Sequence, residues 1–310
     1  MCRRRVANRI RHRSRSPGCG CSSSRIPTAP RWSSSNFRVP QEHRRSYIVA
    51  SSAEATYWHP ESLSGHRVIV TGAARGVGRG IAAALLERGA SVLLVDRDPG
   101  VIGVAGSLAD DRRAVPLVAD LCDRSSYQHI VDVAVESFGG IDALINNAIA
   151  TDEPKPFTDI TMADYDLVFD IGPRATFFLM QAAYPVLKAG GGGSIVNFGS
   201  GSGTGGQKSF GAYAGAKEAI RGMSKVAALE WGIDNIRVNV VCPFANSAGV
   251  AAWSEAVPEV YNKIVRGVPL RRIGDTHADI GAVVAFLLSP DASYMTAQTI
   301  NIDGGTGTYR

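Results

Sequence analysis

From residue 67 onward, short apolar runs alternate with longer segments in which apolar residues have a helical spacing. The runs are nearly continuous in apolar residues, which is typical of strands that are covered on both faces. Regular alternation of such strands with helices predicts an open parallel sheet of the doubly wound α/β kind. The expected strands are 67–71, 91–96, 114–119, 143–146, 194–198, 236–241 and 299–302. The expected helices are 77–89, 124–138, 161–188, 211–232 and 276–289.

The first fifty residues differ in composition from the rest of the 310-residue chain. They hold twelve arginines and one acid, Glu42, whereas the remaining residues hold 21 basic and 27 acidic side chains. A segment rich in arginine, serine and proline buries too little apolar surface to offset its chain entropy. We therefore expect a disordered extension over residues 1–60 and one folded domain over residues 61–310.

Three interpretations of this extension stay open. It could be an organellar transit peptide, because such leaders are rich in arginine and serine and poor in acids. It could be a basic arm that contacts nucleic acid or anionic lipid. The favoured interpretation is upstream sequence read through an overlong translation start, with the ordinary protein beginning near Val49.

Composition also excludes several classes of partner. The folded part is mildly acidic, so the net charge of +5 gives no reason to expect a nucleic acid partner. No run approaches the roughly 18 consecutive apolar residues of a membrane helix, and no apolar stretch follows the N-terminal charges as in a secretory signal. The five cysteines and six histidines have no metal-ligand spacing, so no metal is expected. We expect a cytoplasmic protein without membrane contact.

A glycine-rich segment joins the first expected strand to the first expected helix, and it reads Thr71-Gly72-Ala73-Ala74-Arg75-Gly76-Val77-Gly78. Its three glycines, Gly72, Gly76 and Gly78, allow a tight turn and a close approach of the backbone to a pyrophosphate. The N-terminus of the following helix would attract the same group through its free N–H groups and its dipole. The segment therefore predicts a dinucleotide site.

Asp96, at the end of the second expected strand, bears on the choice of nucleotide. Its carboxylate can accept hydrogen bonds from both hydroxyls of an adenosine ribose, and it would repel a 2′-phosphate. Arg75 and Arg97 argue the other way, because either could receive that phosphate. We judge the carboxylate decisive and expect NAD rather than NADP as the cofactor.

With its Gly-x-x-x-Gly-x-Gly spacing and several further motifs in order, the chain from about Leu63 to Gly305 resembles a classical short-chain dehydrogenase/reductase. The further motifs are Asp120-Leu121, Asn146-Asn147-Ala148, Ser200 with Tyr213-Ala214-Gly215-Ala216-Lys217, Arg237-Val238-Asn239 and Asp303-Gly304-Gly305. The resemblance implies a single-domain Rossmann fold of seven parallel strands, a homotetramer or homodimer, and hydride transfer between a nicotinamide cofactor and a carbonyl or hydroxyl group. It also implies cofactor contacts from Arg75, Val77, Asp120, Leu121, Asn147 and Pro243.

Tyr213 is the expected general acid and base. A free phenol with a pKa of about 10 is a weak base at neutral pH, so a cation is expected beside it to lower that pKa. Lys217 lies four residues further along the same face of the expected helix and would supply this charge. By the resemblance, Lys217 also binds the nicotinamide ribose. Ser200, at the end of the fifth expected strand, would orient the substrate oxygen.

Three positions depart from the family's pattern. Gly172 stands where members usually carry an asparagine, and Pro173 after it predicts a kink that exposes carbonyl groups. Ile149 stands where a glycine usually follows Asn-Asn-Ala, and Phe244 stands where a glycine usually follows Pro243. Because Ile149 and Phe244 flank the expected nicotinamide pocket, they could reshape the site for an unusual substrate or mark lost activity.

Residues 245–270 correspond to the family's substrate lid, and their apolar side chains at helical spacing could pack or could contact substrate. We expect an uncharged, fairly apolar secondary alcohol or ketone as the small-molecule substrate. Two alternatives stay open. One is an NADP-linked 3-oxoacyl reductase, against which Asp96 argues. The other is a non-catalytic NAD-binding relative, against which the intact set of Ser200, Tyr213 and Lys217 argues.

Overall fold

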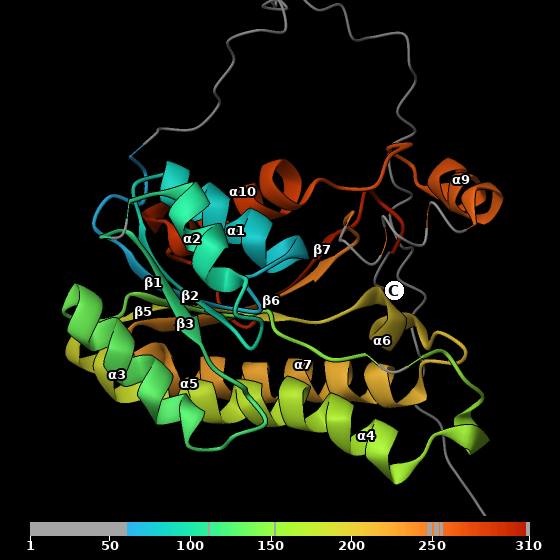
Figure 1. The fold of residues 1–310 in the computed structure, drawn as a ribbon, viewed down its shortest axis with the longest axis horizontal. Helices are drawn as coiled ribbons and strands as arrows, with labels where there is room; N and C mark the ends of the chain where they lie inside the picture. The colour runs from blue at the N-terminus through green and yellow to red at the C-terminus, as the bar shows by residue number, and fades with distance from the viewer. Residues whose placement is uncertain are drawn as a thin grey trace, which may run out of the picture. The chain divides into compact units, whose positions relative to one another are not determined.

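The computed structural model describes residues 61–307, apart from residues 111, 152, 247–249, 251–253 and 255–256, and within them it forms a seven-stranded sheet. All strand pairs are parallel, in the order β3-β2-β1-β4-β5-β6-β7 (Figure 1). The strands are β1 Arg67–Thr71, β2 Ser91–Asp96, β3 Ala114–Val118, β4 Ala143–Asn146, β5 Gly193–Phe198, β6 Ile236–Pro243 and β7 Thr299–Ile302. The strand order reverses between β1 and β4, so the doubly wound Rossmann fold predicted from the sequence is confirmed. The predicted extension, residues 1–60, lies outside the described residues.

Helices cover both faces of the sheet (Figure 1). On one face lie α1 Gly76–Glu87, α2 Val101–Leu108 and α10 Ala282–Leu288. On the other face lie α3 Ser126–Phe138, α4 Met162–Phe169, α5 Ala175–Ala189 and α7 Gly211–Trp231. Two further helices, α6 Gly201–Gly205 and α9 Pro258–Gly267, follow β5 and β6. None of these described helices is long and apolar enough to cross a membrane.

The continuous apolar runs of the sequence follow from this layering. Val68 and Val70 of β1 pack in the core that contains α1 and α10, whereas Ile69 between them packs in the core that contains α3 and α5. Val68 also pairs with Val92 of β2 and with Ala143 of β4. Between Arg67 at its start and Thr71 at its end, β1 is therefore buried on both faces and paired on both edges, which leaves no position for a polar side chain.

One expected helix, residues 161–188, is interrupted. α4 ends at Phe169, a π-helical turn, η3, spans Asp170–Arg174, and α5 begins at Ala175. Pro173 lies inside this turn and has no N–H to donate, so it interrupts the regular hydrogen-bond ladder. The irregularity that Pro173 predicted is present as a π turn in a helix that continues beyond it.

Several other boundaries differ from the sequence prediction, among them those of β3, β6 and the helix expected over 276–289. β3 ends at Val118 and β6 continues to Pro243. The expected helix 276–289 begins as a second π turn, η5 Thr276–Gly281, before α10. The sequence did not predict α2, because Gly103 and Gly106 in this eight-residue helix obscure its apolar spacing.

Candidate active site

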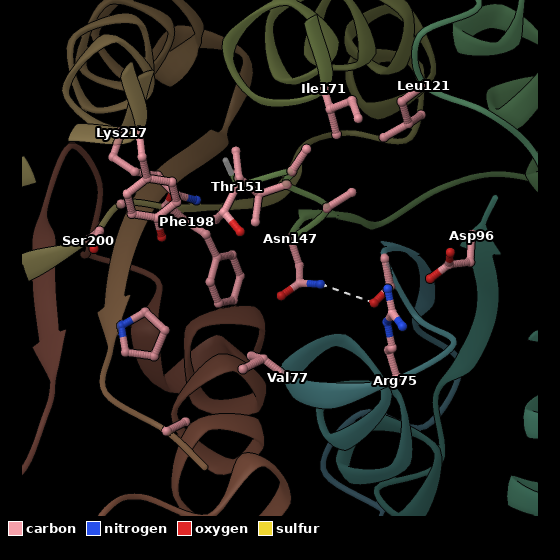
Figure 2. Close-up of a pocket in the computed structure, with 18 of the residues that line it drawn as sticks. Arg75, Val77, Asp96, Leu121, Asn147, Thr151, Ile171, Phe198, Ser200 and Lys217 are labelled. Carbon is pink, nitrogen blue, oxygen red and sulfur yellow. Dashed lines mark hydrogen bonds between the residues drawn. The ribbon is translucent and has the colours of Figure 1, made fainter. Parts of the chain in front are cut away.

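A cavity of about 720 Å³ opens at the carboxyl ends of the strands. Its walls come from the loops that follow β1 to β6, which is where ligands bind in doubly wound sheets. The predicted site residues that line it are Gly72, Arg75, Val77, Asp96, Asp120, Leu121, Asn147, Ser200, Tyr213, Lys217 and Pro243. Figure 2 shows Arg75 and Asp96 at one end, Ser200, Phe198 and Lys217 at the other, and Asn147 with Val77 between them.

Gly72 and Gly76 have left-handed backbone conformations, with φ of +68° and +57°, that favour glycine. A β-carbon at Gly72 would lie 2.9 Å from Nδ2 of Asn147. Gly76 and Gly78 do not line the cavity; a β-carbon at Gly78 would overlap the carbonyl oxygen of Gly72. Gly78 thus lets α1 pack against the glycine-rich loop, while Gly72 and Gly76 give that loop its shape.

Hydrogen bonds join the loop after β1 to the loop after β4. The hydroxyl of Thr71 accepts from the backbone N–H groups of Asn147 and Ala148, both at 3.1 Å. Nδ2 of Asn147 donates to the carbonyl oxygens of Thr71 and Gly72, at 2.9 and 3.2 Å. In the described structure no side chain caps the N-terminus of α1, so the first N–H groups of this helix could donate to a bound anion such as a phosphate.

The Asp96 carboxylate lies where β2 ends and lines the cavity. Its Oδ2 accepts from the backbone N–H of Ala74 at 2.9 Å, and its Oδ1 accepts from the N–H of Asp98 at 3.0 Å. Each carboxylate oxygen has a further lone pair for a ribose hydroxyl. Arg75 and Arg97 line the same end of the cavity. The loop, the helix N-terminus and this carboxylate fit the pyrophosphate and adenosine ribose of a dinucleotide.

Tyr213 and Lys217 lie one turn apart on α7, and both line the inner end of the cavity. Nζ of Lys217 lies 5.5 Å from the centroid of the Tyr213 ring and donates to the carbonyl oxygen of Phe198 at 2.9 Å. Ser200 caps α6, where its Oγ accepts from the N–H of Ser202 at 3.1 Å, and its side chain lies near the Tyr213 hydroxyl. Two hydroxyls and an ammonium group therefore line the same end of the cavity, where they can hold a substrate oxygen and move a proton.

Burial governs the protonation of this group. Burial raises the pKa of Tyr213, and the nearby Ser200 hydroxyl partly opposes that rise. Burial lowers the pKa of Lys217 from 10.5 to about 8. Burial of the phenol therefore opposes the lowering of its pKa that the sequence predicts from Lys217.

Much of the cavity lining is apolar. Ile149, Ile171, Phe198, Phe210, Phe244 and Val250 contribute to its lining. The sequence had singled out Ile149 and Phe244 only as departures from a pattern. Phe198 was missed, because its role in binding Lys217 uses a main-chain carbonyl oxygen that carries no sequence signal.

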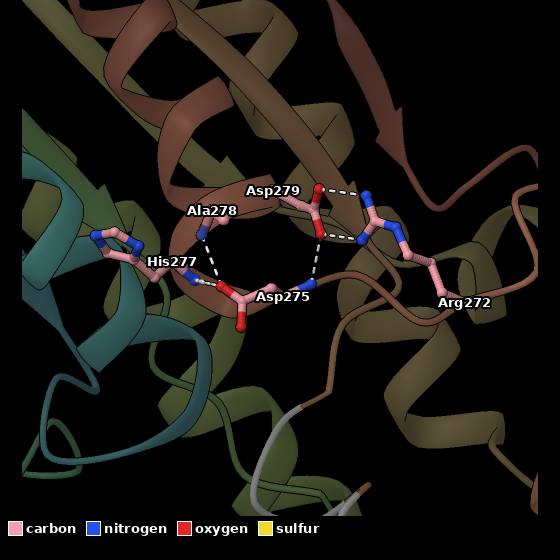
Figure 3. A network of polar contacts seen from close by, with 5 residues as sticks. All are labelled: Arg272, Asp275, His277, Ala278 and Asp279. Carbon is pink, nitrogen blue, oxygen red and sulfur yellow. Dashed lines mark hydrogen bonds and ion pairs between the residues drawn. The ribbon is translucent and has the colours of Figure 1, made fainter. Parts of the chain in front are cut away.

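The expected lid contains α9, and Val250 from this region lines the cavity, whereas Trp253 lies outside the described residues. Beyond α9 the chain is fixed by a polar network (Figure 3). The Arg272 guanidinium binds both carboxylate oxygens of Asp279. Asp279 Oδ2 also accepts from the N–H of Asp275, at 2.6 Å. Oδ1 of Asp275 accepts from the N–H groups of residues 277 and 278 in η5, so the segment that follows the lid leads into a capped helical turn.

Comparison with known proteins gives consistent matches across the described region. The family model adh_short_C2, described as enoyl-(acyl carrier protein) reductase, matches residues 72–307. A 12alpha-hydroxysteroid dehydrogenase from Clostridium sp. (strain ATCC 29733 / VPI C48-50) is 41% identical over 254 residues, which cover 79% of this chain and 98% of that protein.

Solved structures show the same relationship. A Beutenbergia cavernae protein with bound NADP at low occupancy superposes with a TM-score of 0.73 at 31% identity, covering 80% of this chain and 99% of that one. The 3-ketoacyl-(acyl-carrier-protein) reductase of Brucella melitensis, complexed with NADH, superposes with a TM-score of 0.73 at 26% identity, covering 79% of this chain and 100% of that one.

Proposed function

The chain belongs to the classical short-chain dehydrogenases/reductases, oxidoreductases that act on alcohols and ketones, and we propose that it transfers a hydride between NAD and a secondary alcohol or ketone with Tyr213 as general acid and base. The observation that carries this proposal is the meeting of Ser200, Tyr213 and Lys217 at the inner end of the cavity whose outer end holds the glycine-rich loop. A bound nicotinamide would accept the hydride in alcohol oxidation and supply it in ketone reduction.

In alcohol oxidation the substrate hydroxyl would lie against the hydroxyls of Ser200 and Tyr213. Ser200 orients the oxygen, and Tyr213 takes its proton as the carbon gives up hydride. Lys217, held by the Phe198 carbonyl oxygen, carries its positive charge below a pH of about 8 and favours the phenolate through that charge. In ketone reduction the same groups act in the opposite direction, and Tyr213 donates its proton to the developing alkoxide.

The proposed substrate is an uncharged, fairly apolar alcohol or ketone, and a hydroxysteroid is the first candidate. Aromatic and aliphatic side chains make up much of the cavity lining, and the 41%-identical relative is named for a hydroxysteroid. The test is a screen of secondary alcohols and ketones, hydroxysteroids included, with NAD(H) and NADP(H), followed by absorbance at 340 nm. Failure of every substrate with both cofactors would contradict the proposal.

NAD is the proposed cofactor, because the Asp96 carboxylate stands where a ribose 2′-phosphate would be repelled. Calorimetry should find tighter binding of NADH than of NADPH, and Asp96→Ala should narrow that preference by about tenfold. Asp98→Ala is the matched control, since Asp98 does not line the cavity. Tighter binding of NADPH by the unmodified protein would contradict the assignment.

We also propose a homotetramer or homodimer in the cytoplasm. Large apolar side chains are exposed on two helices of one face, among them Phe177 and Phe178 of α5 and Leu229 of α7, the last at 79% exposure. A second copy of this chain would cover such a surface. Light scattering at micromolar concentration is the test, and a monomer would contradict the assembly. Cell fractionation tests the compartment.

A further inference from the structure

Two residues far apart in the sequence are in contact at the inner wall of the cavity. A β-carbon at Gly172 would lie 2.7 Å from Cδ1 of Ile149, which is closer than two carbon atoms can approach. Gly172 is buried in η3, whereas Ile149 is half-buried in the loop after β4 and lines the cavity. The terminal methyl group of Ile149 thus occupies the space that a side chain at position 172 would need.

The other walls of this space belong to the helix that carries the reactive groups. The same β-carbon position lies 4.0 Å from Cβ of Ala216 and 4.0 Å from Cδ1 of Ile220. Both residues are buried in α7, and Ala216 directly precedes Lys217. The space is therefore an apolar seat between η3 and α7, one residue away from Lys217.

We propose that Gly172 provides the seat for Ile149, and that this pair determines how bulky a substrate can reach Tyr213. The inference rests on the proposed function and names a specificity-determining pair within the same site. With glycine at 172, the terminal methyl group of Ile149 can lie against η3. A side chain at 172 would drive that methyl group out toward the cavity, because the buried walls on α7 have little room to yield.

The proposal predicts an effect that depends on substrate size. Gly172→Ala should raise KM for a hydroxysteroid by about tenfold or more, as expected from overpacking by one methyl group, while kcat/KM for cyclohexanol stays within about threefold. Ile149→Val removes Cδ1, so the double variant should bring the hydroxysteroid KM back to within about threefold of the original value. Affinity for NADH, measured by calorimetry, should change by less than about threefold throughout.

The control is Gly222→Ala on α7, because a β-carbon there meets no atom within 4 Å. It should leave the ratio of kcat/KM for the hydroxysteroid to kcat/KM for cyclohexanol unchanged. Two results would each overturn the proposal. One is an equal loss of kcat/KM for the hydroxysteroid and for cyclohexanol in Gly172→Ala, and the other is a hydroxysteroid KM that does not recover in the double variant. Should Gly172→Ala not fold, Ile149→Ala tests the same idea alone, because it should shift the ratio toward the hydroxysteroid.

Failure of this inference and failure of the proposed function are distinguishable. If the unmodified protein oxidises or reduces no substrate, the proposed function fails, and the size effect is then measured as hydroxysteroid binding by calorimetry in the presence of NADH. The unmodified protein, the double variant and Gly222→Ala should then bind the hydroxysteroid with similar affinity, and Gly172→Ala should bind it more weakly. An unmodified protein that neither turns over nor binds the hydroxysteroid overturns the inference as well, because the pair would then control access for no bulky ligand.

Discussion

Lys217 should make the stability of this protein depend on pH in an unusual direction. Its pKa is about 8 in the folded chain, against 10.5 for an unburied lysine. Between these values the unfolded chain binds more protons than the folded chain, so the free energy of unfolding rises with pH as the cost of burying the ammonium group disappears. The pKa values differ by about 2.5, which corresponds to about 3 kcal/mol at about 1.36 kcal/mol per pKa unit. The full cost is present below about pH 8.

Replacing Lys217 by methionine removes this cost while keeping a side chain of similar length. The variant also loses the hydrogen bond to the Phe198 carbonyl, at about 1 kcal/mol, but that loss does not change with pH. The difference in unfolding free energy between Lys217→Met and the original protein should therefore shift in favour of the original by about 2 kcal/mol between pH 7 and 9.5. Urea unfolding followed by circular dichroism, at one protein concentration, measures it.

Lys225→Met is the matched control, since Lys225 is an exposed lysine on the same helix. Its unfolding free energy should keep a constant offset from the original protein over the same pH range. Parallel pH profiles for Lys217→Met and the original protein would refute the reasoning, because they would mean that burial leaves the lysine with an ordinary pKa. A gap that widens with rising pH would refute it too.

Three shorter predictions concern the reactive phenol, the glycine-rich loop and the N-terminal segment. Tyr213→Phe should lower kcat by about 10² to 10⁴, the usual worth of general acid–base catalysis, while calorimetry shows NADH affinity kept; a loss below tenfold would remove Tyr213 from the mechanism. Gly78→Ala should weaken NADH binding and lower the melting temperature, because its β-carbon would overlap the Gly72 carbonyl oxygen; unchanged values would mean that α1 shifts freely. Deleting residues 1–48 should leave the melting temperature and turnover unchanged, because their composition offers little apolar surface to bury, and a large fall would show that they dock on the folded domain.

The strands were predictable because a strand that is buried on both faces has a continuous run of apolar residues, as in β1 and β2. The residues that line the cavity were predictable because they follow these strands directly, as Gly72 follows β1 and Asp96 ends β2. The helix α2 was not predicted because its glycines interrupt the apolar spacing. No local sequence pattern predicts that the irregularity at Gly172 is a π turn.

Contacts between distant segments could not be predicted. Ile149 and Gly172 each stood out as a departure, but the sequence holds no sign that one fills the space left by the other. The same holds for the bond from Lys217 to the Phe198 carbonyl oxygen, and for the balance of burial and charge that sets the pKa of Tyr213. Such properties depend on packing in three dimensions, which spacing along the chain does not encode.

The hydroxyl of Thr71, which accepts from two N–H groups of the loop after β4, has a consequence for how nucleotide affinity can change. Together with the side-chain amide of Asn147, it braces the two central loops of the sheet before any nucleotide arrives, so binding need not supply the entropy of ordering them. The loop after β1, at the phosphate end of the cavity, and the loop after β4, toward its nicotinamide end, are thereby held together as one rigid unit. A substitution at Asp96 can retune the recognition of the ribose locally, whereas a substitution at Thr71 or Asn147 would displace both ends together.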